Sequence, residues 1–192
     1  MGVINDKLAY KGYSYLLVTK GYGCLCSCVF DKTGTLPECF DASLKYFKDT
    51  YAIDIKNPKP VGGIGYFNVN NLFQNANSKF IGEAAGLQDF LAGFGMRTAF
   101  ESGYLAAQAI IKNQDYHVLA EDAFRNHIKA GVVNRFLFER AAKHNYLPIL
   151  EKMTKLNLSF NILRSVYNFN ILERFEYNEA LEYVEKTYPE IS

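Results

Sequence analysis

The sequence lacks long apolar segments, a marked excess of one charge, and tryptophan. No stretch approaches the roughly 18 apolar residues that a membrane-spanning helix needs. The N-terminus has no basic segment followed by an apolar run, so no signal peptide is expected. The formal net charge of +1 argues against a nucleic-acid partner, because nucleic-acid surfaces gather lysine and arginine. These absences favour an ordinary globular protein.

Cysteine is scarce, and its spacing fits no common disulfide or metal pattern. Cys24, Cys26 and Cys28 alternate along one predicted strand, so their side chains share a face, and Cys39 follows later. Alternate residues of one strand are badly placed for a disulfide, and the spacing matches no usual zinc motif. We interpret all four as reduced, small core residues, which is typical of a cytoplasmic protein.

Catalytic and metal-binding patterns are lacking as well. His117, His127 and His144 form no ligand cluster, and each is interpreted as a surface or helix-capping residue. Ser14 and Ser102 lack the sequence context of a nucleophile elbow. The sequence therefore predicts no metal site and assigns no catalytic residue.

Apolar and aromatic residues, by contrast, are plentiful. Hydrophobic residues make up 49% of the 192 positions and aromatic residues 15%, almost all of them Phe and Tyr. This composition is typical of a folded domain with a real core. An aromatic core can surround a large planar or apolar ligand, but it needs no ligand.

The N-terminal part of the chain has strand patterns. Residues 12–19 and 22–30 are rich in Tyr, Leu, Val and Cys, and Lys20-Gly21 between them suits a tight turn. Further strands are predicted at 61–69, where glycines loosen the pattern, and at 79–82. One helix, opened by Pro37, interrupts this series.

The C-terminal part has helix patterns. Strong helix formers fill residues 96–112, and Asp115 suits the N-cap of a second helix that reaches about Lys129. Gly131 either loosens that helix or merely continues it. Further helical patterns occupy residues 132–145, 148–156, 161–168 and 178–187. Strands come first and helices later, without alternating βαβ units, so the predicted fold class is α+β with an antiparallel sheet.

The junction between these two parts carries the most specific motif. Glu83 lies between Gly82 and Ala84 at the end of a predicted strand, where small neighbours let a ligand approach the backbone. Gly93-Phe94-Gly95 then leads into the helix that starts at Met96. A helix N-terminus stabilises negative charge, and a reduced flavin carries negative charge on its pyrimidine ring.

This junction resembles the second FAD fingerprint of flavoproteins with the p-hydroxybenzoate-hydroxylase fold, in particular the geranylgeranyl reductase family of FAD-dependent oxidoreductases. The stretch "GEAAGLQDFLAGFGMRTAFESGYLAAQAI" carries most of the resemblance. The segments "GYSYLLVTKG" and "KPVGGIGYF" look like strands of that family's substrate-binding sheet. The resemblance covers residues from about 10 to 130 and is vaguer beyond.

The resemblance implies a set of cofactor contacts. Glu83 takes the place of the acid near the ribityl chain or the pyrophosphate, although Glu is one methylene longer than the usual Asp. The turn before the helix takes the place of the backbone that faces the flavin pyrimidine ring. The expected FAD-binding residues are Gly82, Glu83, Ala84, Gly93, Phe94, Gly95 and Met96.

Other contacts stay open between two interpretations. Arg97, in the first turn of the helix, could approach the flavin edge or a phosphate, or form a surface salt bridge. Tyr13, Tyr15 and Tyr66 could line a substrate site or simply belong to the core.

The family's N-terminal Rossmann unit is absent from this sequence. Members of the family begin with a strand, a Gly-x-Gly-x-x-Gly turn and a helix, which bind the ADP half of FAD. Gly63-Ile64-Gly65 is the nearest candidate, but no third glycine follows at the right spacing. We therefore expect the C-terminal portion of a flavoenzyme, which needs the missing nucleotide-binding half as its partner.

The resemblance divides the chain into three parts: a substrate-binding sheet with one helix at 1–78, the strand, FAD-contact loop and helix at 79–113, and a helical region at 114–192. It predicts reduction of carbon–carbon double bonds in a lipid or isoprenoid substrate, which is compatible with peripheral membrane contact. A monooxygenase or halogenase of the same fold, or a non-catalytic isoprenoid-binding module, is the alternative.

Overall fold

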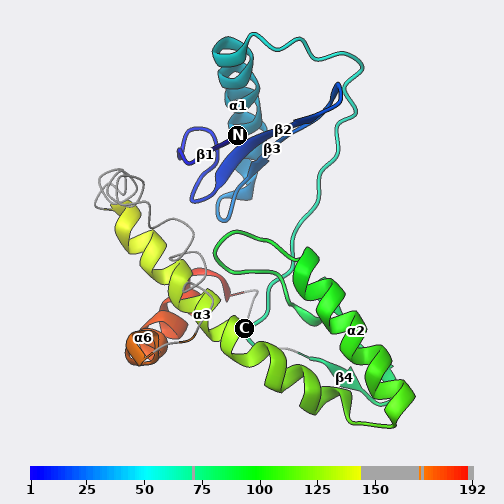
Figure 1. Ribbon diagram of the computed structural model, residues 1–192. Helices are drawn as coiled ribbons and strands as arrows, with labels where there is room; N and C mark the ends of the chain where they lie inside the picture. Colours follow the sequence, from blue (N-terminus) through cyan, green and yellow to red (C-terminus); the bar gives the residue numbers. More distant parts are fainter. Residues whose placement is uncertain (71, 144–168, 170, 190–192) are drawn as a thin grey trace. The chain divides into compact units, whose positions relative to one another are not determined.

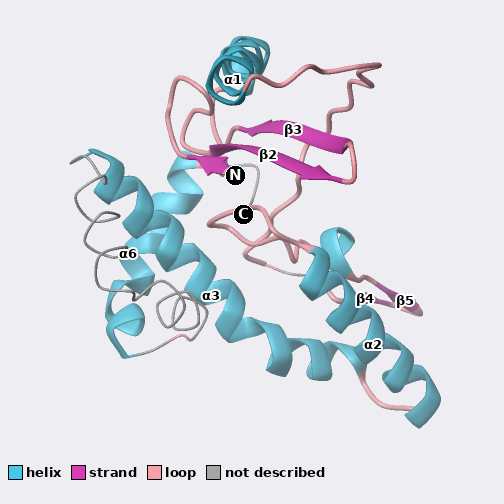
Figure 2. Ribbon diagram, turned by 45° about the horizontal axis from the view of Figure 1, so that its top comes forward, coloured by secondary structure: helices cyan, strands magenta, loops and turns pink. Residues whose placement is uncertain are grey.

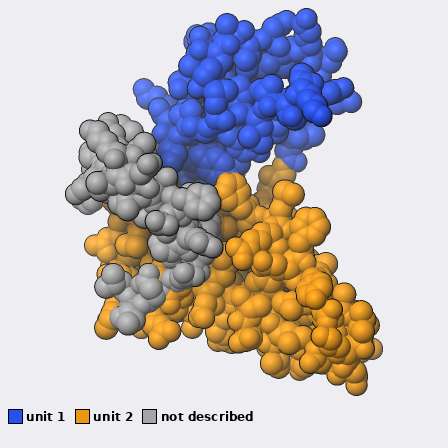
Figure 3. Space-filling model, in the orientation of Figure 1, with its two compact units in different colours: residues 1–62 blue, residues 63–192 orange. Residues whose placement is uncertain are grey.

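The structure is a computed structural model that describes residues 1–70, 72–143, 169 and 171–189 (Figure 1). Within that part the chain forms four α-helices and small antiparallel sheets (Figure 2). This confirms the predicted α+β class. The chain divides into two compact units, residues 1–62 and 63–192, which Figure 3 shows in different colours.

The first unit is built on a three-stranded antiparallel sheet, with β1 (Gly2–Val3), β2 (Tyr13–Thr19) and β3 (Tyr22–Cys28) in that order. Lys20 and Gly21 join β2 to β3 with φ values of 47° and 81°. Two successive positive φ values are those of a type I′ turn, which matches the twist of a hairpin. The hairpin predicted from the sequence is therefore confirmed.

One helix covers this sheet. After a short 3₁₀ turn (Thr33–Thr35), α1 (Leu36–Tyr51) begins with Pro37 in its first turn and ends at Ala52, which has a φ of 49°. Proline is pre-organised for the first turn of a helix, where no N–H donor is needed. Figure 2 shows α1 against one face of β2 and β3.

Three buried serines hold α1 to the sheet. Ser14 of β2, Ser27 of β3 and Ser43 of α1 bring their hydroxyl oxygens to within 2.7–3.2 Å of one another. The carbonyl oxygen of Leu8 lies 3.0 Å from the hydroxyls of both Ser14 and Ser43. Since buried hydroxyl groups are costly without partners, this cluster fixes how α1 sits on the hairpin.

The cysteines are all free thiols, as the sequence predicts, but only one of them belongs to the core. Cys39 of α1 is buried, whereas Cys26 and Cys28 are half-buried and Cys24 is exposed. The three strand cysteines alternate with Ser27, which points at α1, so they occupy the opposite face of the sheet. The prediction of four core cysteines is therefore wrong for Cys24 and overstated for its two neighbours.

The second unit starts with little regular structure. The predicted strand at 61–69 does not form, apart from an isolated antiparallel bridge between Phe67 and Leu87. Closely spaced glycines supply no side chains to pack, which weakens a strand. The strand predicted at 79–82 is only the second arm of a small hairpin, β4 (Gln74–Asn75) and β5 (Ser78–Lys79).

Helices make up the rest of the described second unit. Helix α2 (Met96–Lys112) has the predicted bounds and ends at Asn113, which adopts a left-handed φ of 53°. Helix α3 (Tyr116–Lys143) runs without interruption through Gly131, so two predicted helices are one of 28 residues. Asp115 caps it, as predicted, since its Oδ1 accepts a hydrogen bond from the N–H of His117.

The last described helix, α6 (Ile171–Thr187), starts seven residues before the predicted 178–187 segment. The helices predicted at 148–156 and 161–168 lie outside the described residues. None of the helices described here is long and apolar enough to cross a membrane.

The second unit has two apolar clusters. One packs α2 and the start of α3 against residues 73–87, and the other packs the middle of α3 against α6 and Phe90. The buried members of the first are Phe73, Ala85, Leu87, Ala106, Ala109, Tyr116, Ala120 and Phe124. The buried members of the second are Phe90, Val132, Val133, Phe136, Ala180 and Val184.

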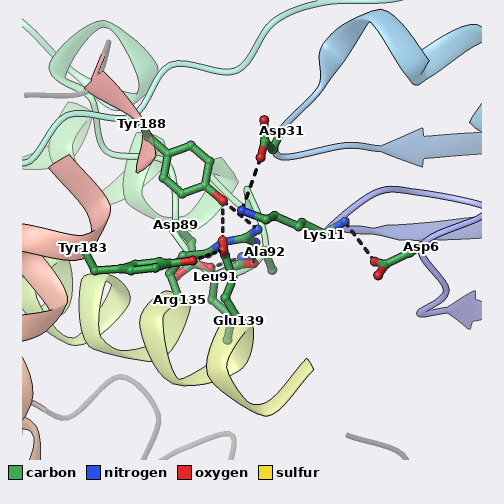
Figure 4. A network of polar contacts seen from close by, with 10 residues as sticks. All are labelled: Asp6, Lys11, Asp31, Asp89, Leu91, Ala92, Arg135, Glu139, Tyr183 and Tyr188. Carbon is green, nitrogen blue, oxygen red and sulfur yellow. Dashed lines mark hydrogen bonds and ion pairs between the residues drawn. The ribbon is translucent and has the colours of Figure 1, made fainter. Parts of the chain in front are cut away.

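A buried ion pair lies beside the second cluster (Figure 4). Arg135 and Glu139, both on α3, are 1% and 3% exposed, and Arg135 Nε lies 2.6 Å from Glu139 Oε1. Tyr183 donates to Glu139 Oε2 at 2.7 Å, and the Tyr188 hydroxyl bonds to both Glu139 and Arg135. Arg135 also donates to the Leu91 carbonyl at 3.4 Å, so the pair joins α3, the end of α6 and the loop before α2.

Candidate functional site

Gly82 opens the candidate site and sits directly against α2. Its φ is +54°, and a Cβ at this position would lie 2.9 Å from the Cβ of Ala99. Its N–H donates to the hydroxyl of Ser102, 2.9 Å away, also on α2. Both the backbone conformation and the lack of space require glycine here, so Gly82 brings the chain to within contact of the helix.

Glu83 and Ala84 follow in a short 3₁₀ turn (Gly82–Ala85) and are exposed. Glu83 Oε1 accepts a hydrogen bond from the N–H of Tyr66 at 3.0 Å. This bond orients an exposed carboxylate beside a stretch of small residues, which is the setting that the sequence predicts for a ligand-binding acid. Gly86 then closes the turn with a φ of 69°.

Asp89 organises the loop between this turn and α2. Its Oδ1 accepts the N–H of Ala92 at 2.7 Å, and its carbonyl oxygen accepts the N–H of Gly93 at 2.7 Å. Its own N–H donates to the carbonyl oxygen of Phe94 at 2.9 Å. An aspartate that bonds to backbone a few residues ahead is a common way to fix a turn. Asp89 therefore sets the path of Gly93 and Phe94.

Asp89 is also electrostatically unusual. The residue is 4% exposed, and among the described residues its Oδ2 has no hydrogen-bond partner. Burial raises the pKa of this carboxyl, while the N–H of Ala92 and the charges of His127 and Arg135 work in the opposite direction. Burial of a carboxylate costs free energy unless the group is paired, so Asp89 lowers the stability of the folded chain while it fixes the loop.

The start of α2 is open at its first turn. Gly95 is the N-cap residue, and no side chain caps the helix. The Thr98 hydroxyl lies 2.7 Å from the Leu87 carbonyl oxygen and 3.0 Å from that of Gly95, so it ties the first turn to the core. The first N–H groups of a helix lack partners within the helix and carry its positive dipole end. This end can accept an anionic or polar group.

The outer face of α2 is apolar and uncovered. Phe100 is 76% exposed, Tyr104 64% and Ile111 77%, and Met96 lies on the same side. These residues, together called the α2 outer face, recur at helical spacing, while Thr98, Ser102, Ala106 and Ala109 are buried on the opposite side. An exposed apolar stripe of this length on a helix is typical of a surface that binds a ligand or another polypeptide.

Arg97 takes one of the two roles left open by the sequence. Its Nε lies 2.8 Å from Glu101 Oε1, four residues later on the exposed side of α2. Arg97 thus forms the surface salt bridge, which leaves its approach to a flavin or phosphate without support.

The remaining candidate residues are divided between the units. Tyr13 and Tyr15 belong to β2 in the first unit, and their rings stack with centroids 6.0 Å apart. Tyr66 belongs to the second unit, is exposed, and accepts a hydrogen bond from Asn68 Nδ2 at 3.0 Å. The structure thus gathers Tyr66 with Glu83, and Tyr13 with Tyr15.

No family model matches the chain, and neither does any curated protein or solved structure.

Sequence reasoning missed three side chains that shape this site. Asp89, Thr98 and Ser102 each bond to backbone atoms of the loop and helix start. The signal for Asp89 was available, since an aspartate shortly before a glycine is typical of a turn. Thr98 and Ser102 gave none, because a hydroxyl inside a helix pattern does not reveal its tertiary partner.

Two of the three histidines, His117 and His127, lie in the described residues. In the described part of the chain, no group of three or more His, Cys, Asp or Glu side chains is placed to hold a metal ion. His127 is half-buried, and this burial lowers the pKa of its imidazole. His117 is exposed, and His144 lies outside the described residues.

Proposed function

We propose that this chain is the C-terminal part of an FAD-dependent oxidoreductase that resembles the geranylgeranyl reductases. The observation that carries the proposal is the arrangement of residues 82–96. A glycine is pinned against α2, an exposed and oriented carboxylate follows it, and the loop returns to an uncapped helix N-terminus. This order is that of the FAD fingerprint which the sequence resembles.

The residues at the start of α2 fit the pyrimidine end of a flavin. The backbone at Gly95 and Met96 would hold that ring, because helix N–H groups and the dipole favour the negative charge of the reduced form. The Glu83 carboxylate would accept hydrogen bonds from hydroxyl groups of the ribityl chain. Its hydrogen bond from the Tyr66 N–H orients it for this role. Gly82 holds the turn against α2, and the small, exposed Ala84 leaves room for the ligand's approach.

The chemistry itself would come from the cofactor, since a bound flavin supplies hydride transfer to a carbon–carbon double bond. The chain's own residues would bind, orient and shield. Phe94 and Met96 are exposed beside the helix start and would exclude water from the ring. Tyr66, whose N–H donates to Glu83, is the proposed contact for a lipid or isoprenoid substrate, and we assign no catalytic acid or base.

The adenosine pyrophosphate would be bound by a further polypeptide segment. The 192 residues contain no Gly-x-Gly-x-x-Gly unit, in which backbone N–H groups and a helix dipole would meet the two phosphates. The α2 outer face supports this proposal, because it offers an exposed apolar surface for a second polypeptide to cover.

The test is to co-express the chain with a polypeptide that carries the Gly-x-Gly-x-x-Gly unit and to record the absorption spectrum. We expect a yellow, FAD-containing complex, and a colourless product when the chain is expressed alone. Recovery of the isolated chain as a yellow monomer with stoichiometric FAD would refute the proposal.

In that complex, Gly95→Val should lower the affinity for FAD by about tenfold or more, or about 1.4 kcal/mol. The added side chain would stand between the helix start and the ring. Gly95 has an ordinary φ of −135°, and a Cβ there would press only on the flexible Gln88 side chain at 3.2 Å, so the fold should tolerate the change.

The matched control is Gly34→Val, because a Cβ at Gly34 meets nothing within 4 Å. Both variants are titrated with FAD by flavin fluorescence quenching. Equal affinities of the two variants for FAD would show that Gly95 does not contact the flavin.

A further inference from the structure

A pair of thiols lies on the face of the first unit's sheet that α1 leaves uncovered. Cys26 and Cys28 alternate on β3, are half-buried, and bring their Sγ atoms to 3.5 Å. In the antiparallel register Tyr15 lies opposite Cys26, and Tyr13 lies opposite Cys28. The two thiols therefore sit side by side, flanked by two tyrosine side chains on the neighbouring strand.

The two sulfurs are in hydrogen-bond contact, and either thiol can be the donor. The thiolate is the form of cysteine that binds a metal ion, so binding of a cation must release the thiol protons.

We propose that Cys26 and Cys28 form a two-thiolate binding site for a soft metal cation of the Zn(II) class. Two sulfurs that each bind one zinc ion at about 2.3 Å with tetrahedral geometry lie about 3.8 Å apart. The observed 3.5 Å needs only a small adjustment of the side chains. The cation replaces the two thiol protons: two sulfur–metal bonds form, two protons are released to the solvent, and no electron is transferred.

The backbone favours chelation over a disulfide. Residues two apart on a strand have Cα atoms about 6.8 Å apart, which is the upper end of the range that a disulfide tolerates. The thiols can therefore share an ion more easily than they can bond to each other. Because the protein supplies two ligands, the other positions of the ion stay open to water or to an added ligand.

The proposal is tested with Cd²⁺ as the probe, on the full chain kept reduced. Cadmium binding is followed by the ultraviolet charge-transfer absorption of the metal–thiolate bond. We expect one ion per chain, and Cys26→Ser and Cys28→Ser should each weaken binding roughly tenfold or more. The matched controls are Cys24→Ser, exposed on the same strand face, and Cys39→Ser, buried in α1; both should bind as the unaltered chain does.

Two results would overturn this assignment. The first is unchanged binding in Cys26→Ser and Cys28→Ser, and the second is an equal loss in Cys24→Ser. Since a variant can fail to fold, the unaltered chain is also alkylated with iodoacetamide with and without Cd²⁺. Mass spectrometry should show that the ion protects Cys26 and Cys28 but not Cys24, and equal labelling in both conditions would contradict the proposal.

Discussion

At Gly82, both the backbone conformation and the packing require glycine. Gly82→Ala should destabilise the chain by roughly 2–4 kcal/mol, because a left-handed φ and a crowded Cβ each carry a penalty. The φ is +54°, and the added carbon would lie 2.9 Å from Ala99 Cβ and 3.2 Å from its Cα. The free energy of unfolding is measured by urea titration.

Gly21→Ala separates these two penalties. Gly21 has a φ of +81° in the β2–β3 turn, but a Cβ there meets nothing within 4 Å. Its replacement should cost only the backbone term, about 1–2 kcal/mol. A Gly82→Ala variant no less stable than Gly21→Ala would mean that the approach of residue 82 to α2 is not tight.

Asp89 should make stability depend on pH. Its pKa in the folded chain is raised above the ordinary 3.8 by burial, so the folded state binds the proton more tightly than the unfolded chain does. The resulting stabilisation is complete below pH 3.8 and is lost as the pH rises through the folded-state pKa. Asp89→Asn keeps an acceptor for the Ala92 N–H and removes this dependence.

The measurement is the thermal midpoint of Asp89→Asn and of the unaltered chain at several pH values between about 4 and 7. Relative to the unaltered chain, the variant should gain stability as the pH rises. The control is Asp41→Asn, which removes a carboxylate on the exposed side of α1. An Asp89→Asn curve parallel to that of Asp41→Asn would show that Asp89 carries no perturbed proton.

At the scale of elements, the Arg135–Glu139 pair is a buried polar link between α3 and α6, through the hydroxyl of Tyr183. Arg135→Met should destabilise the chain by about 3–5 kcal/mol, because it leaves the Glu139 carboxylate buried without its cation. Arg135→Met with Glu139→Leu should recover most of this loss, since no buried charge remains. Urea unfolding of both variants measures the difference.

An exposed pair of the same spacing serves as the control. Lys45 and Asp49 lie 2.7 Å apart on α1 with largely exposed side chains. Lys45→Met should change the free energy of unfolding by no more than about 0.5 kcal/mol, as is usual for surface pairs. If the double variant were as unstable as Arg135→Met alone, packing rather than the unpaired charge would account for the loss.

Elements with local signals could be predicted from the sequence, and those set by tertiary packing could not. The β2–β3 hairpin and the start of α1 followed from Lys20-Gly21 and Pro37, whose backbone preferences act within a few residues. The sequence left open whether Gly131 loosens or continues helix α3, because glycine weakens an isolated helix. In the structure Gly131 lies against Phe90, whose Cβ would be 3.5 Å from an added carbon, and packing holds the helix together.

The candidate site divides in the same way. The order of Glu83, Gly95 and Met96 in the site could be predicted, because turns with glycine and helix starts have recognisable sequence patterns. The tertiary partners of Thr98, Ser102 and Arg135 could not be predicted, since they lie 11, 20 and 44 residues away along the chain. The flavin-binding role of the site stays a prediction.

At the scale of the whole molecule, the α2 outer face should make the isolated chain self-associate. Sedimentation velocity at increasing concentration should show association of the unaltered chain, because burial of the exposed Phe100, Tyr104 and Ile111 removes apolar surface from water. Phe100→Asp should weaken it. Phe175→Asp, which alters an 81% exposed phenylalanine on α6, is the control and should have no effect. Equal association of all three would place the contact elsewhere.

The division into two units also bears on how fast each part can reach its native state. In residues 1–62 the sheet joins neighbours in sequence through a two-residue turn, and α1 follows directly, so that its Ser43 reaches Leu8 across 35 residues. In the second unit the apolar cluster is complete only when Phe90 and Val184, which are distant in sequence, both pack into it. Longer loops cost more entropy before their contacts form, so the two units face kinetic barriers of different height within a single chain.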